Sequence, residues 1–402
     1  MTGDRLNAVV IGAGISGLTT AFHLKQGGMR VAVLEASGRV GGSMETLTDG
    51  PWRFEMGPHT VRENHESVGR LIRETGLERE RIIATPSGKR RYLYKGGELV
   101  PLPAGPGGFL KTPLFPASAK LRLLKEPWIG RPPEGTEETI AQFTRRRLGQ
   151  AFLDYAVGPF VSGVYAGDPE RLSVRWAVPK IHSLETEHGS LIRGAFARRK
   201  GPAPGGAMIS FREGLEELPR RLAREIGDVR TGVAAQRVTL AGNGYVVETP
   251  AGPVEAARVI LAVPADIAAR LLEDVTAGAS RLFAEIPYAP VASVSLGWRR
   301  SDIGHPLAGF GFLSPRKEGL RVLGCLFPSE FFPGRAPEGH VALAAFLGGR
   351  TDPEIVAQDE TRIAETVVSE LSGPLGLRGK PAFLNVRRWP RAIPQYEVGH
   401  GC

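Results

Sequence analysis

Three glycines and one glutamate near the N-terminus have the types and spacing of a dinucleotide-binding loop. Gly12, Gly14 and Gly17 form the pattern G-x-G-x-x-G, and Glu35 follows roughly 20 positions later. Glycine allows a sharp turn and lets the backbone approach a pyrophosphate, while a carboxylate accepts hydrogen bonds from ribose hydroxyls. The negative charge also repels a 2′-phosphate, which disfavours NADP. These residues therefore predict a site for the pyrophosphate and ribose of a dinucleotide.

The segments around the glycines have the patterns of the elements that must position them. Residues 8–11 form an apolar run typical of a buried parallel strand, residues 18–26 have a helical pattern, and residues 30–34 form a second strand that ends at Glu35. The helix N-terminus would present free N–H groups and a partial positive charge to the phosphates. The contacts predicted from this strand–helix–strand unit are Gly12, Ala13, Gly14, Ile15, Ser16, Gly17, Glu35 and Ala36.

The residues after Glu35 extend the pattern beyond what a nicotinamide domain requires. The run Arg39-Val40-Gly41-Gly42 resembles the start of a flavoprotein superfamily that includes amine oxidases, phytoene desaturases and protoporphyrinogen oxidases. The resemblance implies that the dinucleotide is FAD, that the turn at residues 57–60 passes the flavin ring, and that the region of Val233 lies near the adenine. The further cofactor contacts that it implies are Arg39, Gly41, Gly42, Gly57, Pro58, His59, Thr60 and Val233.

A longer motif narrows the resemblance to one family. The sequence GVYAGDPERLS at residues 163–173 resembles the signature of protoporphyrinogen oxidases, and the matches extend over nearly the whole chain. The resemblance implies a six-electron oxidation of a porphyrinogen, with flavin N5 as the hydride acceptor and O2 as the final acceptor, which yields hydrogen peroxide. The substrate contacts that it implies are Arg62 on a propionate, Gly163 close to the macrocycle, and Phe310, Leu313 and Phe346 around its rings. The further matching segments are residues 187–191, 210–219, 309–313, 347–349 and 393–400.

Other interpretations stay open at this stage. From the residues alone, Arg62 is a solvated side chain, His59 is a turn residue, and Phe310 and Phe346 are ordinary core. Protoporphyrinogen IX is our first choice of substrate, and coproporphyrinogen III, with two propionates in place of two vinyl groups, is the alternative. A flavin amine oxidase and a non-enzymatic carrier of the same fold, similar to GDP-dissociation inhibitors, are the competing classes. We find no catalytic side-chain set and no metal-ligand cluster, because the cofactor would carry the chemistry.

The composition bounds the class of protein. The 402 residues are 42% hydrophobic and 23% charged, with a net charge of +9, as in a globular protein of two or three domains. We expect no nucleic-acid partner, since no RNA-binding signature accompanies the positive charge. The two cysteines exclude a disulfide scaffold, and Cys325, inside an apolar run, is expected to be a buried small hydrophobe. We expect no signal peptide and no transmembrane helix, and therefore a cytoplasmic protein with membrane contact or a homodimer left open.

The predicted fold class is α/β, or α+β overall, in three parts. A Rossmann-like FAD-binding domain is expected at residues 1–84 and 205–264, and a mixed-sheet substrate domain at residues 85–100, 189–204 and 265–398. A helical subdomain is expected at residues 101–188, where prolines, glycines and exposed apolar residues beside Lys and Arg suit either a peripheral membrane surface or a lid that closes a cavity. Relatives continue past residue 402 with a strand and a helix that contact the flavin, so we expect weak retention of FAD.

Several local predictions can be compared directly with the structure. A helix is predicted over residues 136–148, with Thr136 as its N-cap and Thr139 at the third helical position. The arginines at residues 145–147 are predicted to form a solvated face. Strands are predicted at residues 229–233 and 245–248, separated by the turn at residues 242–244. The basic segment at residues 198–206 is predicted to be mobile.

Overall fold

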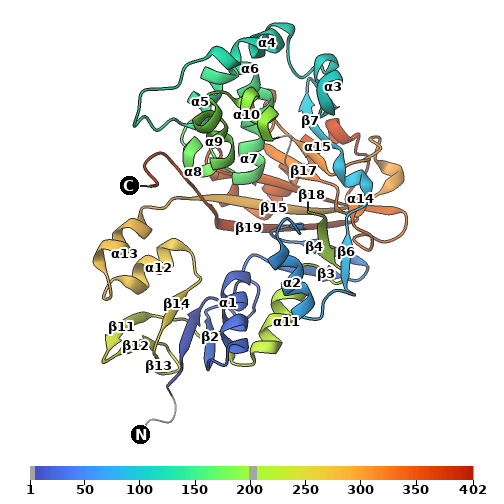
Figure 1. Ribbon diagram of the computed structural model, residues 1–402. Helices are drawn as coiled ribbons and strands as arrows, with labels where there is room; N and C mark the ends of the chain where they lie inside the picture. Colours follow the sequence, from blue (N-terminus) through green and yellow to red (C-terminus); the bar gives the residue numbers. More distant parts are fainter. Residues whose placement is uncertain (1–4, 199–205, 402) are drawn as a thin grey trace. The chain divides into compact units, whose positions relative to one another are not determined.

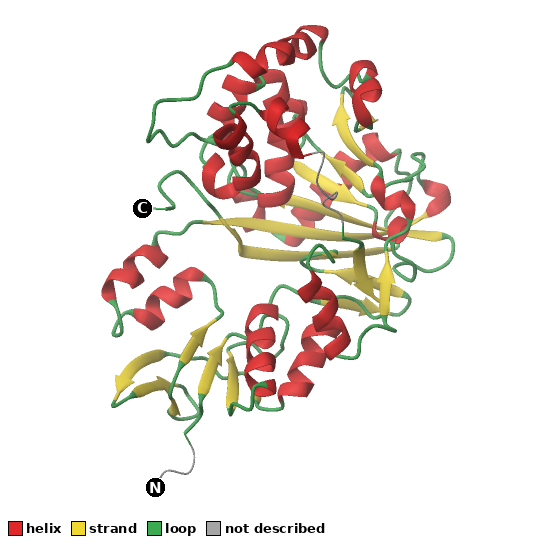
Figure 2. Cartoon of the chain, viewed as in Figure 1, coloured by secondary structure: helices red, strands yellow, loops and turns green. Residues whose placement is uncertain are grey.

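The computed structural model describes residues 5–198 and 206–401, which form two compact units (Figures 1 and 2). The first unit combines Met1–Ile83 with Gly206–Ile286, and the second combines Ala84–Gly205 with Pro287–Cys402. Each unit therefore contains segments from both halves of the chain. Residues 199–205 of the predicted basic segment lie outside the described residues.

A parallel four-stranded sheet forms the centre of the first unit, in the order β10-β2-β1-β14. Helix α1 (Ile15–Gln26) connects β1 to β2, as predicted, and packs beside α11 (Glu217–Ile226). Leu18 of α1 and Leu218 and Leu222 of α11 are buried in one apolar cluster under the sheet. The sheet consists of β1 (Ala8–Ile11), β2 (Val31–Glu35), β10 (Val229–Thr231) and β14 (Val259–Leu261).

An antiparallel sheet of three strands corrects one prediction. The turn at residues 242–244 joins β11 (Arg237–Ala241) to β12 (Gly244–Glu248), while β10 belongs to the parallel sheet. Strand β11 was missed because only Val238 of its five residues is buried, so it has no apolar run. The unit continues beyond residue 264 to residue 286, since Leu271 of α12 packs in one cluster with Val238. The other elements here are β13 (Val254–Ala256), α12 (Ala265–Leu272) and α13 (Ala277–Ala284).

Two small sheets and one helix complete the first unit. Strands β3 and β4 form a hairpin, and β5 and β6 pair on either side of β9. The helix is α2, whose N-cap is His65, because the His65 ring accepts a hydrogen bond from the Ser67 amide. Their bounds are β3 (Thr46–Asp49), β4 (Trp52–Glu55), β5 (Val61–Arg62), β6 (Arg81–Ile83), β9 (Met208–Phe211) and α2 (Glu66–Glu74).

A seven-stranded mixed sheet, in the order β19-β15-β18-β17-β16-β7-β8, organises the second unit. Strands β16 and β7 are parallel and the other neighbours are antiparallel. Helix α15 (Glu360–Leu375) covers one face, where Val367 and Leu371 pack with Val294 and Ala345. Cys325 is in the same cluster, as predicted, and burial raises the pKa of its thiol. The strands are β7 (Arg91–Lys95), β8 (Glu98–Pro101), β15 (Tyr288–Arg299), β16 (Gly311–Leu313), β17 (Val322–Leu326), β18 (His340–Gly348) and β19 (Phe383–Pro394).

Helices from residues 105 to 198 form the other part of the second unit. The predicted helix start at Thr136 is wrong, because the N-cap of α5 is Thr139. The Thr139 hydroxyl accepts from the Gln142 amide at 3.1 Å, and the Gln142 side chain accepts from the Thr139 amide at 2.9 Å, which is a capping box. The helices are α3 (Gly105–Lys111), α4 (Ala117–Arg122), α5 (Ile140–Arg147), α6 (Gln150–Phe152), a π-helical turn (Leu153–Val157), α7 (Gly158–Tyr165), α8 (Val174–Ala177), α9 (Pro179–His188), α10 (Leu191–Arg198) and the separate α14 (Pro328–Phe331).

The arginine run at the end of α5 is not a solvated face, which corrects a second prediction. Arg147 is fully buried and forms ion pairs with Glu126 and Glu185. Glu126 also accepts the amides of Leu191 and Ile192 at 2.9 and 3.1 Å, and so caps α10. Burial raises the pKa of Glu185, but the hydrogen bonds from Arg146 and Arg147 outweigh burial and hold that pKa below its usual range. The Glu185 carboxylate thus stays charged, and the cluster connects α5, α9, α10 and the 3-10 turn after α4 (Leu123–Trp128).

Replacing Arg147 by methionine should lower the free energy of unfolding by about 3–5 kcal/mol, because it removes the buried cation that pairs with both Glu126 and Glu185. Arg145→Ala is the matched control. That arginine is two positions earlier, has a partly exposed side chain and pairs with Glu170, so its loss should cost less than about 1 kcal/mol. Urea unfolding followed by circular dichroism measures both. Equal losses of unfolding free energy in the two variants would contradict the role of Arg147 as the cation of a buried ion-pair cluster.

Candidate functional site

Two of the three motif glycines are required by the fold itself. Gly12 has a φ of +105°, and a Cβ there would lie 2.4 Å from the Ala262 carbonyl oxygen of the segment that follows β14. A Cβ on Gly17 would lie 2.0 Å from the Gly12 carbonyl oxygen. Both distances are shorter than any real contact, so only glycine lets β1, α1 and the segment after β14 approach this closely.

Gly14 differs, because no heavy atom lies within 4 Å of a Cβ built there. Gly14 is the N-cap of α1, with an ordinary φ of −70°, and neither a side-chain cap nor an acidic residue in the first turn competes for the free N–H groups. The protein therefore leaves open space in front of an uncapped helix N-terminus. Such a site fits a pyrophosphate, whose charge the helix dipole and the amides of Ile15 and Ser16 would stabilise.

The Glu35 carboxylate lies beside this helix end. One of its oxygens accepts from the Ala13 amide and the other from the Ser37 amide, each at 2.8 Å. A carboxylate has about four acceptor sites, so each oxygen can still accept a ribose hydroxyl. The Glu35 carbonyl oxygen accepts from the Val233 amide at 2.9 Å, which brings Val233 to the same place. The exposed Ala36 lies between Glu35 and Ser37.

A second glycine loop lies directly on the first. The Gly41 amide donates to the Ala13 carbonyl at 2.8 Å, and a Cβ on Gly42 would lie 3.2 Å from the Gly14 Cα. Arg39 holds this second loop, because its guanidinium donates to the Gly42 carbonyl at 2.6 Å and to Glu45 at 2.9 Å. The sequence predicted that Arg39 contacts the cofactor, and this stays a prediction.

The turn after β4 packs against the end of the second glycine loop. A Cβ on Gly57 would lie 2.1 Å from the carbonyl oxygen of Ser43, the residue that follows the second glycine loop. Beyond Pro58, His59 is buried and Thr60 is half-buried. The first unit therefore brings the three predicted loops together in order, and their open Gly14 end fits FAD.

Arg62 follows two residues after Thr60 and lies on β5. Its side chain is exposed, and its backbone pairs with Met208 of β9. The other four predicted substrate residues belong to the second unit. Arg62 could serve a carboxylate through its planar fork of donors, and that role stays a prediction.

In the second unit, three predicted substrate residues share one face of the seven-stranded sheet. A Cβ on Gly163 of α7 would lie 2.3 Å from Leu313 Cδ2, so the helix packs flush against that side chain. Leu313 pairs with Gly324, and Gly324 pairs with Phe346 on the next strand. Since paired residues of neighbouring strands point to the same face, Leu313 and Phe346 line one wall.

Phe310 lies in a separate aromatic group. Its ring centroid lies 4.7 Å from that of Phe331, and the Arg91 guanidinium lies 5.3 Å from the Phe310 ring centroid. Arg91 was not among the predicted site residues. The available signal was the basic run at residues 89–91, at the start of the β7–β8 hairpin.

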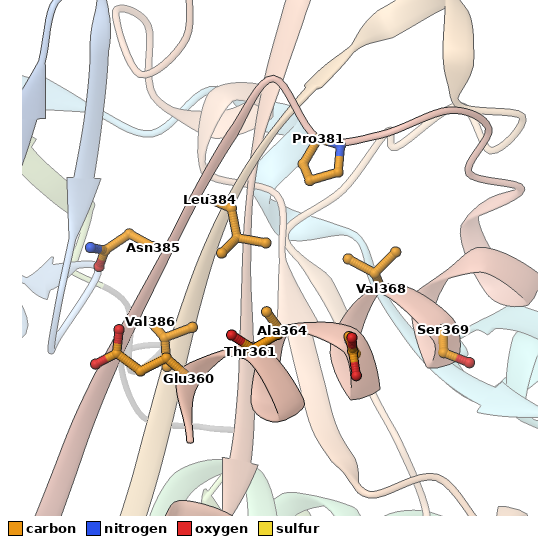
Figure 3. A pocket seen from close by; sticks show the side chains of 10 residues that line it. Glu360, Thr361, Ala364, Val368, Ser369, Pro381, Leu384, Asn385 and Val386 are labelled. Atoms are coloured by element: carbon orange, nitrogen blue, oxygen red, sulfur yellow. The ribbon is translucent and has the colours of Figure 1, made fainter. Parts of the chain in front are cut away.

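A cavity of about 650 Å³ between α15 and β19 contains none of the predicted site residues (Figure 3). Its apolar wall consists of Ala364, Val368, Leu384 and Val386, and Glu360 lies at its edge. Another cavity, of about 590 Å³, is lined by Lys89, Arg90 and Arg91 and by prolines of the β7–β8 region. The predicted site residues are therefore defined by loops and by a sheet face, and not by the α15 cavity.

Comparison with known proteins also indicates a flavin-binding protein. The family described as flavin containing amine oxidoreductase matches residues 15–402. A chloroplastic protoporphyrinogen oxidase of Oryza sativa subsp. japonica is 35% identical and aligns with 99% of this chain and 80% of its own length. A coproporphyrinogen III oxidase of Bacillus subtilis is 28% identical and aligns with 100% and 89% of the two chains.

Solved structures show the same fold. A crystal structure from Exiguobacterium sp. 255-15 aligns with a TM-score of 0.83 at 24% identity, over 100% of this chain and 89% of that chain. Putrescine oxidase bound to putrescine aligns with a TM-score of 0.73 at 19% identity, over 99% and 89%. The dinucleotide loops and the fold thus define a flavoprotein. The chain belongs to the flavin containing amine oxidoreductase family, and it is an FAD-dependent oxidoreductase.

The open space at Gly14 leads to a sharp prediction. Gly14→Ala should leave the thermal stability of the FAD-free protein nearly unchanged, because the methyl group meets nothing and the lower entropy of the unfolded alanine chain offsets the poorer N-cap. The same methyl group should weaken FAD binding at least about tenfold, since it occupies the space of the pyrophosphate. Flavin fluorescence titration measures affinity and differential scanning fluorimetry measures stability.

Gly17→Ala is the control. Its Cβ would meet the Gly12 carbonyl at 2.0 Å, so this substitution should destabilise the FAD-free protein. Unaltered FAD affinity in Gly14→Ala would show that the pyrophosphate does not approach this glycine.

Proposed function

We propose that this chain oxidises a porphyrinogen to the corresponding porphyrin by six electrons, with O2 as the final acceptor and protoporphyrinogen IX as the substrate. The observation that carries the proposal is the 35% identity to a protein named protoporphyrinogen oxidase, over 99% of this chain. The contact of Gly163 with Leu313 also supports it, because it brings two of the predicted substrate residues together in the second unit.

The side chains of the proposed site bind and orient, and do not carry the reaction. Bound FAD supplies the hydride acceptor. Leu313 and Phe346 would offer an apolar wall that excludes water from the macrocycle, and the missing side chain of Gly163 lets α7 pack directly against Leu313. Arg62 and Arg91 are proposed to pair with propionates, since a guanidinium recognises a carboxylate through two parallel hydrogen bonds.

Coproporphyrinogen III is the second candidate substrate. It is favoured by the relative from Bacillus subtilis, named coproporphyrinogen III oxidase, which aligns with 100% of this chain. The cavity lined by Lys89, Arg90 and Arg91 also supports it, because the additional propionates of this substrate need additional cations. The amine-oxidase alternative is supported by the family description and by solved structures of low sequence identity, such as putrescine oxidase at 19%. The carrier alternative is supported by none of the proteins named above.

A peripheral membrane contact is proposed for the surface formed by α3, α4 and the 3-10 turn after α4. The side chains of Leu110, Leu121, Leu124 and Trp128 are 63–78% exposed there, with Lys111 and Lys125 beside them. Apolar side chains with neighbouring cations suit the boundary between headgroups and acyl chains. Within the described part of the chain, none of the helices has both the length and the apolar character to span a membrane. The cytoplasmic location and the homodimer stay predictions.

The proposed function is tested by porphyrin fluorescence in air, with excess FAD and with each porphyrinogen supplied separately. We expect a rise above the protein-free blank, and a higher kcat/KM with protoporphyrinogen IX than with coproporphyrinogen III. A higher value with coproporphyrinogen III would assign the second substrate. A protein that binds FAD but gives no rise with either substrate would contradict the oxidase assignment.

A further inference from the structure

Two serine hydroxyls inside the second unit have no hydrogen-bond partner. The side chains of Ser293 and Ser295 on β15 are 3% and 1% exposed, and within residues 5–198 and 206–401 neither hydroxyl reaches a donor or an acceptor. Leaving a buried hydroxyl unpaired costs free energy, and the large majority of buried polar groups in proteins are paired. Two such hydroxyls, two positions apart on one strand, therefore need an explanation.

Both serines lie on the sheet face opposite α15. Val294, the residue between them, packs in the cluster that includes Val367 and Leu371 of α15. Because successive side chains of a strand point to opposite faces, Ser293 and Ser295 point away from that helix. Phe346, which pairs with Ser293, shares their face.

The strand register places Ser293 in one row with the proposed substrate wall. The row crosses five strands, and neighbouring strands lie about 4.8 Å apart, so Ser293 is next to Phe346 and roughly 14 Å from Leu313. This span is comparable to the width of a porphyrinogen with its side groups. The residues of the row, in order, are Leu313, Gly324, Phe346, Ser293 and Arg387.

We propose that the Ser293 hydroxyl, with Ser295 beside it, accepts a hydrogen bond from a pyrrole N–H of the porphyrinogen. This inference rests on the proposed function. A porphyrinogen has four N–H donors at the centre of its macrocycle and carboxylates only at its edge. A serine oxygen has two lone pairs and can accept from such a donor. In the row, Ser293 lies next to the aromatic Phe346. A macrocycle whose apolar edge contacts Phe346 would therefore place its centre near the Ser293 hydroxyl.

A hydrogen bond to Ser293 would distinguish the substrate from the product. Six-electron oxidation removes one hydrogen from each of the four meso carbons and two hydrogens from pyrrole nitrogens, so the porphyrin retains two of the four N–H donors. The hydroxyl therefore contributes more to binding of the porphyrinogen than to binding of the porphyrin. Through this residue, substrate binding is favoured over retention of product.

The test uses the full-length protein with FAD and compares Ser293→Ala with Ser314→Ala. Ser314 is the matched control, because its hydroxyl is also buried and unpartnered in the described residues but lies outside the row. We expect Ser293→Ala to raise KM for the porphyrinogen about two- to twelvefold, the range for one lost hydrogen bond, with a smaller rise in the inhibition constant of the porphyrin. Thermal stability without substrate should stay equal or increase, since the alanine removes an unpaired polar group.

The outcomes separate this inference from the proposed function. Active wild-type protein, with KM unchanged in Ser293→Ala, would overturn the serine assignment and leave the oxidase assignment in place. A fall in thermal stability together with equal rises in KM and in the inhibition constant would show a structural role and would also overturn it. Wild-type protein that binds FAD and oxidises neither porphyrinogen would overturn both.

Discussion

The close approach of the backbone at Gly12 is the constraint on which the cofactor loops depend. Its carbonyl lies where a side chain on Gly17 would be, and its own missing side chain leaves room for the Ala262 carbonyl. This contact fixes the start of α1 and therefore the direction of its free N–H groups. The loop of Gly41 then pairs with Ala13. One approach of two backbone segments thus orients every later contact of the predicted dinucleotide site.

In the second unit, strand register brings predicted substrate residues together, whereas close backbone contacts bring the predicted cofactor loops together in the first unit. Its long strands present two faces with different chemistry, because one is covered by α15 and carries a continuous apolar cluster. The other carries Leu313, Phe346 and Ser293, which mix apolar wall and unpaired hydroxyl. Such a mixture would be a poor core, since the hydroxyl is unsatisfied. It suits a surface that receives a ligand with both apolar edges and polar N–H groups.

Sequence reasoning succeeded where the signal is local. The fingerprint predicted β1, α1 and β2, because turn glycines and an apolar run report directly on backbone conformation. It failed at Arg147, whose burial depends on Glu126 and Glu185, which are 21 and 38 positions away. The capping error had a local signal, since Thr139 and Gln142 match the box better than Thr136 and Thr139.

The candidate site shows the same division. The positions of Glu35 and the glycines around the start of α1 could be predicted, because each lies in its own short loop, while their contacts with the cofactor stay predictions. Ser293 could not, because in the sequence it is one polar residue in a strand, and its meaning appears only when Phe346 is paired beside it. Long-range pairing of strands is set by the whole sheet, and no local pattern reports it.

We propose that FAD bound by this chain accepts the electrons of a porphyrinogen. This proposal is tested most directly by mixing FAD-loaded protein with protoporphyrinogen IX in the absence of oxygen and recording the absorption spectrum. We expect loss of the oxidised flavin bands on mixing, and their return when air is admitted. Flavin bands that persist unchanged with protoporphyrinogen IX and with coproporphyrinogen III would contradict it.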